Sequence, residues 1–270
     1  MIPSFIYGTA WKEEETERLV CQALDSGFLA IDTANQRKHY FEEAVGRGLT
    51  KFLHSHSQKR ENLWLQTKFT YARGQDHRLP YDPEASFTDQ VNQSFASSLK
   101  HLNTDYLDSY ILHGPFSRHG IDKVDLEVWS AMTILKESGK TKEIGISNVS
   151  LPQLKELHKT ARAKPAFVQN RCYARTGWDL RVREFCSENN IHYQGFSLLT
   201  ANGHELNSDV VKAMAQKYNK TISQITFRFA QQMGMIPLTG TTNKAHMLED
   251  LDIQDFELTS SEVSIFMHLS

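Results

Sequence analysis

Four side chains stand out as able to do chemistry, because three of them close short apolar segments. Asp32, Lys68 and His113 each end such a segment, and Tyr40 lies in the polar stretch that follows Asp32. A carboxylate at the end of a buried strand is costly unless a cation or several hydrogen bonds offset its desolvation. Ionisable groups and a tyrosine at successive strand ends are typical of an acid/base site on a parallel sheet.

Alternating strand-like and helix-like segments must bring these side chains together. The segments predicted as strands are 3–8, 28–31, 63–67, 106–113, 141–146, 166–168, 191–196 and one that starts at 235. The segments predicted as helices are 13–26, 41–54, 83–102, 124–137, one that begins near 150, 179–188, 209–218, 222–232, 242–251 and 259–269. Eight strands, each followed by helix, predict one α/β domain over 1–270, a single (β/α)8 TIM barrel. Strand C-terminal ends share one face of such a barrel, so Asp32, Lys68 and His113 become neighbours.

Two observations argue against other folds. The chain has 270 residues, and no shift in composition marks a domain boundary. The first strand is not followed by a GxGxxG motif, which weakens a doubly wound dinucleotide-binding sheet. A hydrolytic barrel is also disfavoured, because no pair of carboxylates stands at the strand ends.

Composition limits the classes of partner and compartment. The 30 basic and 32 acidic residues give a formal net charge of -2, so we expect neither nucleic acid nor a membrane as a partner. Three cysteines without metal or redox spacing predict reduced thiols in a cytoplasmic protein. His54 and His56 lack further ligands at a useful spacing, so we predict no metal site. We expect a monomer or a weak oligomer.

An ordered set of motifs resembles the aldo-keto reductases. These motifs are GTAWK (8–12), IDTA (31–34), TK (67–68), DYLDSYILHGP (105–115), GKTKEIGISN (139–148) and FELTSSE (256–262). They span nearly the whole chain in the order that the family shows. The resemblance implies a (β/α)8 barrel that reduces small aldehydes or ketones to alcohols by hydride transfer from a nicotinamide cofactor.

The resemblance also implies a catalytic tetrad of Asp32, Tyr40, Lys68 and His113. The segment that carries the tyrosine is two residues longer here than in the usual family pattern, so His39 or Tyr40 must occupy its site. We favour Tyr40, because only Tyr40 supplies a phenol.

These four residues suit carbonyl reduction, which needs a proton donor to the carbonyl oxygen. A free phenol has a pKa of about 10 and is a reluctant acid at neutral pH. We expect the ammonium of Lys68 to lower the pKa of Tyr40, which then acts as general acid. Asp32 would keep Lys68 charged, and neutral His113 would donate to the substrate carbonyl.

Cofactor contacts follow from the same resemblance. Ser147, Asn148 and Gln169 would bind the nicotinamide carboxamide, and Phe196 would stack on its ring. The remaining implied contacts are Gly8, Thr9, Thr241, Thr242, Asn243, His246, Glu249 and Asp250. The lysine and arginine with which relatives grip the 2′-phosphate have no clear equivalents, so we expect NADPH on family grounds and leave NADH open.

The substrate pocket is predicted to be open. The chain begins at its first predicted strand and ends soon after its last helix, so we expect no N-terminal hairpin and a truncated C-terminal loop. The pocket contacts would then be Trp11, Phe69 and Phe116, with broad selectivity for small aldehydes and ketones. The alternative is a regulatory or structural protein of the same fold that binds the cofactor with little turnover.

Overall fold

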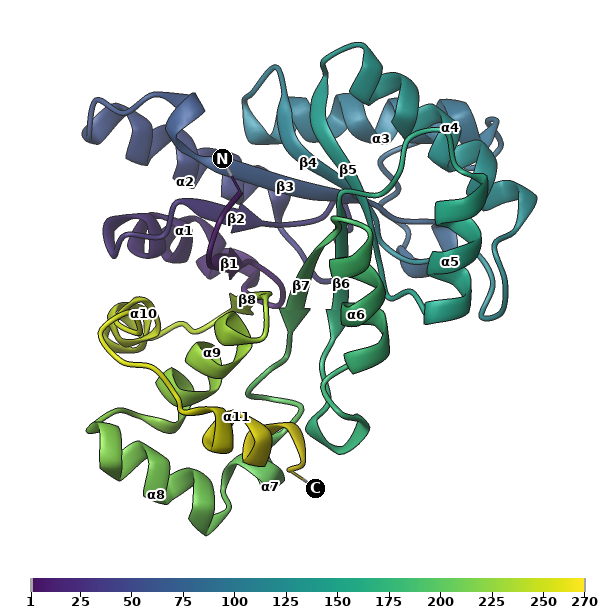
Figure 1. Ribbon diagram of the computed structural model, residues 1–270. Coiled ribbons are helices and arrows are strands. Elements are labelled where there is room, and N and C mark those ends of the chain that lie inside the picture. Colours follow the sequence, from purple (N-terminus) through teal and green to yellow (C-terminus); the bar gives the residue numbers. More distant parts are fainter. Residues whose placement is uncertain (1, 270) are drawn as a thin grey trace.

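Eight parallel strands close into one barrel in the computed structural model, which describes residues 2–269 (Figure 1). The strands are β1 (Ile6–Gly8), β2 (Ala30–Asp32), β3 (Trp64–Phe69), β4 (Leu107–Leu112), β5 (Thr141–Ser147), β6 (Phe167–Arg171), β7 (His192–Phe196) and β8 (Met235–Thr239). Each strand pairs with the next, and β8 pairs with β1. The predicted (β/α)8 barrel is confirmed, although both ends of the predicted domain 1–270 lie outside the described residues.

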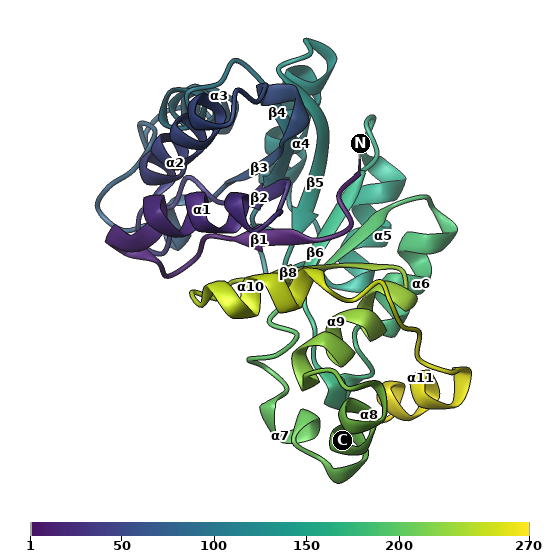
Figure 2. The ribbon, with the colours of Figure 1, turned by 90° about the vertical axis from the view of Figure 1, so that its left-hand side faces the viewer.

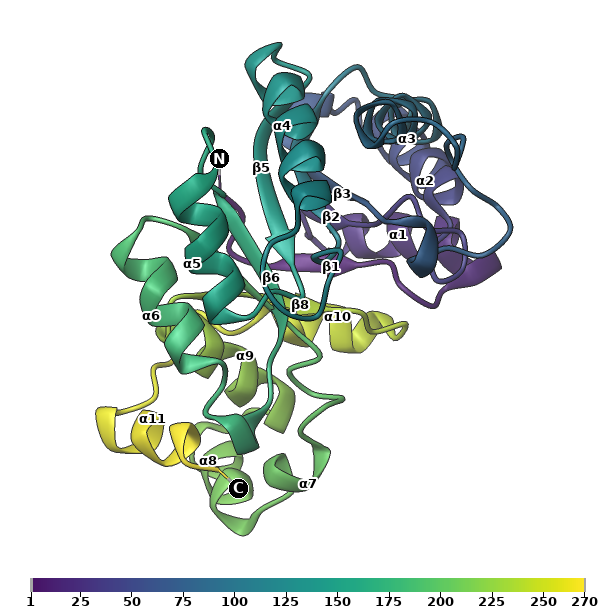
Figure 3. The ribbon, with the colours of Figure 1, turned by 90° about the vertical axis from the view of Figure 1, so that its right-hand side faces the viewer.

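Helices surround the strands, as Figures 2 and 3 show. They are α1 (Thr16–Asp25), α2 (Glu42–Ser55), α3 (Phe87–Leu102), α4 (Lys123–Glu137), α5 (Leu151–Thr160), α6 (Leu180–Glu188), α7 (Gly203–Leu206), α8 (Asp209–Tyr218), α9 (Ile222–Gln232), α10 (Lys244–Leu251) and α11 (Ser260–Met267). Four 3-10 turns accompany them: η1 (Glu13–Glu15), η2 (Arg60–Asn62), η3 (Ala72–Gly74) and η4 (Ala174–Thr176). Across residues 2–269, every helix is too short or too polar to cross a membrane.

Most predicted elements are present, with shifted ends. The predicted strand 28–31 is Ala30–Asp32 instead, because Phe28 packs into the core before the strand starts and Leu29 is 55% exposed. The short helix α7 was not predicted, because its four residues cannot show a helical period. Thr259 and Glu262 form a capping box at the start of α11.

The inside of the barrel has an apolar layer and a polar layer. Side chains of the strands form the apolar layer: Ile6, Ala30, Trp64, Ile111, Phe167, Ile236 and Leu238. Asp32, Gln66, Gln169 and Gln194 form the polar layer. Gln66 Nε2 donates to Asp32 Oδ1 at 2.6 Å and to Gln194 Oε1 at 2.9 Å. Gln169 Nε2 donates to the same two oxygens at 3.1 and 2.9 Å. The polar layer supports the end of β2 from inside the barrel.

The packing of α2 against the end of α3 depends on Gly46. A Cβ atom at Gly46 would lie 1.9 Å from the carbonyl oxygen of His101. We predict that Gly46→Ala lowers the free energy of unfolding by about 1–3 kcal/mol, because two backbones must move apart. Urea denaturation measures the change. Gly203→Ala is the control, because its Cβ would enter open space. Equal losses in the two variants would contradict this account of the contact.

Candidate active site

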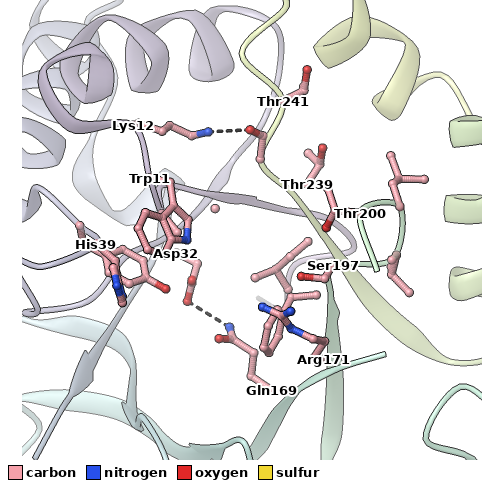
Figure 4. Close-up of a pocket in the computed structure, with 18 of the residues that line it drawn as sticks. Trp11, Lys12, Asp32, His39, Gln169, Arg171, Ser197, Thr200, Thr239 and Thr241 are labelled. Carbon is pink, nitrogen blue, oxygen red and sulfur yellow. Dashed lines mark hydrogen bonds between the residues drawn. The ribbon is translucent and has the colours of Figure 1, made fainter. Parts of the chain in front are cut away.

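A cavity of about 730 Å³ opens at the C-terminal ends of the strands (Figure 4). Three predicted catalytic residues line it: Asp32, Tyr40 and His113. The predicted cofactor contacts that line it are Gly8, Ser147, Asn148, Gln169, Phe196, Thr241, Thr242, His246 and Asp250. Of the predicted substrate contacts, Trp11 lines it. Residues far apart in the sequence therefore share one site, because parallel strands end at the same face.

Lys68 lies behind this cavity and is completely buried. Its Nζ donates to both carboxylate oxygens of Asp32, at 2.7 and 2.6 Å, and to the carbonyl oxygen of Thr33 at 2.8 Å. These bonds use all three hydrogens of the ammonium. Burial lowers the pKa of Lys68, and the Asp32 carboxylate opposes this shift.

Tyr40 lies close to both Lys68 and His113. Its ring centroid is 5.2 Å from Lys68 Nζ and 6.0 Å from the ring of His113. Within residues 2–269 its hydroxyl has no hydrogen-bond partner, so it is free to bond a molecule in the cavity. The expected lowering of the Tyr40 pKa is not found: burial, and then the Asp32 carboxylate, raise it. The phenol is thus kept protonated, the form that a proton donor needs.

His113 is held in place from three directions. Its backbone N–H donates to the Phe69 carbonyl oxygen at 2.9 Å, and its carbonyl oxygen accepts from Asn148 Nδ2 at 2.8 Å. Ring atom Nδ1 lies 2.7 Å from the hydroxyl oxygen of Thr70. Burial, with the charge of Lys68, lowers the pKa of His113 to about 3. The imidazole is therefore neutral at neutral pH.

The longer segment after β2 places His39 and Tyr40 differently. The His39 ring packs against the Trp11 indole with centroids 3.9 Å apart (Figure 4). The backbone N–H of Trp11 also donates to the His39 carbonyl oxygen at 2.7 Å. Trp11 itself is 70% exposed. His39 is thus engaged at the mouth of the cavity, whereas Tyr40 lies beside Lys68 and His113.

Two predicted substrate contacts are corrected. Phe69 is buried outside the barrel, with ring centroids 5.3 Å from Tyr71 and 5.6 Å from Tyr81. Side chains alternate along a strand, so Lys68 points inward and Phe69 points outward. Phe116 packs against Tyr71, at 5.2 Å between centroids, and does not line the cavity.

Three predicted cofactor contacts also lie outside the cavity lining. Thr9 is buried, and its hydroxyl donates to the Asp32 carbonyl oxygen at 3.0 Å. Asn243 caps α10, where its side chain accepts from the N–H of Ala245. Glu249 is on the same helix but is not part of the lining. Thr9 and Asn243 thus bond to the backbone near the site, a role that the motif alone could not distinguish from ligand contact.

Lys12 lines the cavity and was not predicted. It is 6% exposed, and its Nζ donates to the Gly240 carbonyl oxygen at 2.6 Å. Over the described part of the chain, no carboxylate pairs with this ammonium. Burial lowers the pKa of Lys12 to about 8. The residue lies in an irregular segment after β1, so no periodic pattern indicated its direction.

Arg171 and Asp250 also contribute charged side chains to the lining. The Arg171 guanidinium packs over the Phe196 ring, 5.5 Å from its centroid. The Asp250 carboxylate accepts from the Thr239 hydroxyl at 2.7 Å, and burial raises the pKa of Asp250 to about 6. Figure 4 shows Arg171 beside Gln169, across the cavity from His39.

Asp32, Lys68, Tyr40 and His113 thus lie together at one end of the barrel. The aldo/keto reductase family profile matches residues 5–270, and the chain belongs to this family. It is an NAD(P)H-dependent oxidoreductase.

Relatives and solved structures agree with this family. The chain is 30% identical over 250 residues to a glyoxal reductase of Bacillus subtilis, covering 92% of this chain and 81% of that protein. It is 28% identical over 282 residues to an NADPH-dependent alpha-keto amide reductase of Saccharomyces cerevisiae, covering 95% and 82% of the two chains. A Bombyx mori aldo-keto reductase, solved in complex with NADP, superimposes with a TM-score of 0.84 at 26% identity, covering 99% and 89%.

Neutral His113 generates a prediction about stability and pH. Its pKa is about 3 in the fold against an ordinary 6.5, so between these values the unfolded chain binds a proton that the folded chain does not. This contribution to stability is complete above pH 6.5 and is lost as pH falls. We expect the free energy of unfolding to fall less steeply from pH 6.5 to about pH 4 in His113→Gln than in wild type.

Urea denaturation across this pH range measures the two slopes. His204→Gln, which removes an exposed histidine, is the control and should keep the wild-type slope. If His113→Gln and wild type lose stability in parallel, His113 is not buried in its neutral form.

Proposed function

We propose that this protein reduces small aldehydes and ketones to alcohols, with Tyr40 as the proton donor. The observation that carries the proposal is the position of Tyr40, which lines the cavity beside both the Asp32–Lys68 pair and neutral His113. The names of the two curated relatives, a glyoxal reductase and an alpha-keto amide reductase, support a carbonyl substrate.

The lining fits a nicotinamide dinucleotide. Lys12 is a buried ammonium without a carboxylate partner among residues 2–269, which suits the negative charge of a pyrophosphate. Ser147, Asn148 and Gln169 supply polar groups to the lining, and Phe196 offers an aromatic face. When bound, the cofactor would supply the hydride, because no side chain can deliver one.

We propose NADPH, since the silkworm relative was solved with NADP. The unusual phosphate segment leaves NADH open.

The chain's own residues would act on the carbonyl oxygen. The Tyr40 hydroxyl and the His113 ring would donate to this oxygen and hold it. As negative charge develops there, the Tyr40 proton would move to it. The resulting phenolate would lie close to the Lys68 ammonium. The attraction between these two charges is stronger in a buried site than in water. Asp32 would keep that ammonium charged and fixed.

Removal of the phenol tests the proton donor. We expect Tyr40→Phe to lower kcat for a small activated aldehyde by at least ~100-fold, because general acid catalysis is lost. The decrease in NADPH absorbance measures turnover. Tyr106→Phe is the matched control, because Tyr106 directly precedes β4 at the opposite end of the barrel and its ring contacts Arg60.

His39→Phe completes this experiment. An inactive His39→Phe beside an active Tyr40→Phe would make His39 the proton donor and overturn our assignment. No turnover by the wild-type protein, with cofactor binding intact, would instead favour the cofactor-binding regulatory or structural protein.

Lys12 generates a prediction about cofactor binding. We expect Lys12→Met to weaken NADPH binding roughly 10- to 100-fold, because a charge-assisted hydrogen bond to a phosphate is lost. Quenching of tryptophan fluorescence measures binding without turnover. Lys140→Met, which removes an exposed lysine before β5, should bind NADPH normally. Tighter binding of NADH than of NADPH by the wild-type protein would contradict the choice of NADPH.

A further inference from the structure

Thr70 follows β3 directly and is fixed next to His113. Its side chain is 6% exposed, and its hydroxyl oxygen lies 2.7 Å from His113 Nδ1. Its carbonyl oxygen accepts from the Tyr81 hydroxyl at 2.7 Å. Its methyl group lies against Gly74, where an added Cβ would be only 2.7 Å away. Packing and hydrogen bonds therefore fix the direction of the Thr70 hydroxyl.

Hydrogen-bond accounting selects one tautomer of His113. A neutral imidazole carries its proton on either Nδ1 or Nε2. In the part of the chain that the structure describes, His113 Nδ1 is the one partner of the Thr70 hydroxyl. A proton on Nδ1 would leave the hydroxyl hydrogen of the buried Thr70 without an acceptor within the protein, at a cost of about 1–3 kcal/mol. A proton on Nε2 lets Thr70 donate to Nδ1, and both groups are then satisfied.

We propose that Thr70 is a positioning residue whose hydroxyl donates to His113 Nδ1 and keeps the imidazole proton on Nε2. The proposal rests on the proposed function in one respect: the Nε2–H would donate to the substrate's carbonyl oxygen. In the other tautomer Nε2 would present a lone pair, and this lone pair would repel the carbonyl oxygen. Thr70 thus determines whether His113 attracts or rejects a carbonyl group, without contacting the substrate.

Nitrogen-15 NMR of the histidine rings tests the tautomer in the protein without cofactor. The chain has 12 histidines, so the His113 signals are assigned by their loss in His113→Gln. We expect wild type to carry the proton on Nε2. Thr70→Val, which is nearly isosteric but lacks the hydroxyl, should show protonation of Nδ1 in part or in full. Thr70→Ser keeps the hydroxyl and should restore the wild-type spectrum.

Steady-state kinetics give the second measurement. We expect Thr70→Val to lower kcat for a small aldehyde roughly tenfold or more, because one hydrogen bond to the reacting oxygen is lost. The KM for NADPH should not change, because Thr70 does not line the cavity. Thr70→Ser should recover most of the kcat. A general packing defect would not produce this separation between kcat and KM.

Several results would overturn the proposal. One is a wild-type spectrum with the proton on Nδ1. Another is a Thr70→Val protein that retains both the Nε2 tautomer and the wild-type kcat. If Thr70→Val does not fold, the wild-type spectrum still decides, and a Thr70→Ser protein with altered tautomer also counts against it. An Nε2-protonated wild type without turnover would support the role of Thr70 and overturn the proposed function instead.

Discussion

The structure depends on one constraint: a carboxylate and an ammonium are both held inside the barrel. Asp32 and Lys68 lose their water on folding, and such a pair is stable only if further hydrogen bonds satisfy both ions. The Thr33 carbonyl oxygen accepts the third hydrogen of the Lys68 ammonium, while the side-chain amides of Gln66 and Gln169 donate to the Asp32 carboxylate. The polar layer across the barrel thus stabilises this buried ion pair. Tyr40 and His113 lie next to the pair, at the mouth of the barrel.

In this arrangement the Lys68 ammonium does not face the cavity, whereas two uncharged side chains do. Tyr40 and His113 face the cavity in their neutral forms, whereas the Lys68 ammonium lies behind the cavity. Lys68 helps to keep His113 neutral, and its ammonium lies within 5.2 Å of the Tyr40 ring centroid. A neutral pair of donors at the surface of a cavity, with a fixed cation behind it, favours charge that develops during a reaction over charge already present.

The fold could be predicted from the sequence because alternation of strands and helices is a periodic signal. Asp32, Lys68 and His113 could be found because a polar group that closes an apolar segment is unusual. The direction of the neighbouring side chains could not be predicted from the sequence, because it depends on where each strand begins and ends. The sequence predicts Phe69 as a pocket residue, although its side chain points the opposite way from that of Lys68. Lys12 lies in an irregular segment, where no periodic pattern predicts the direction of a side chain. The contact between Thr70 and His113 joins residues 43 positions apart, and only the register of β3 and β4 brings them together.

The hydrogen bond from Lys12 to the Gly240 carbonyl has a consequence for the energetics of ligand capture. This ammonium is nearly buried in the fold, and a backbone oxygen accepts one of its hydrogens. An anion that binds Lys12 would replace the Gly240 carbonyl oxygen as the hydrogen-bond acceptor, and little water would have to be removed from the ammonium. Much of the dehydration cost of this cation therefore belongs to folding and not to association, which preorganises Lys12 for the phosphate that we propose it binds.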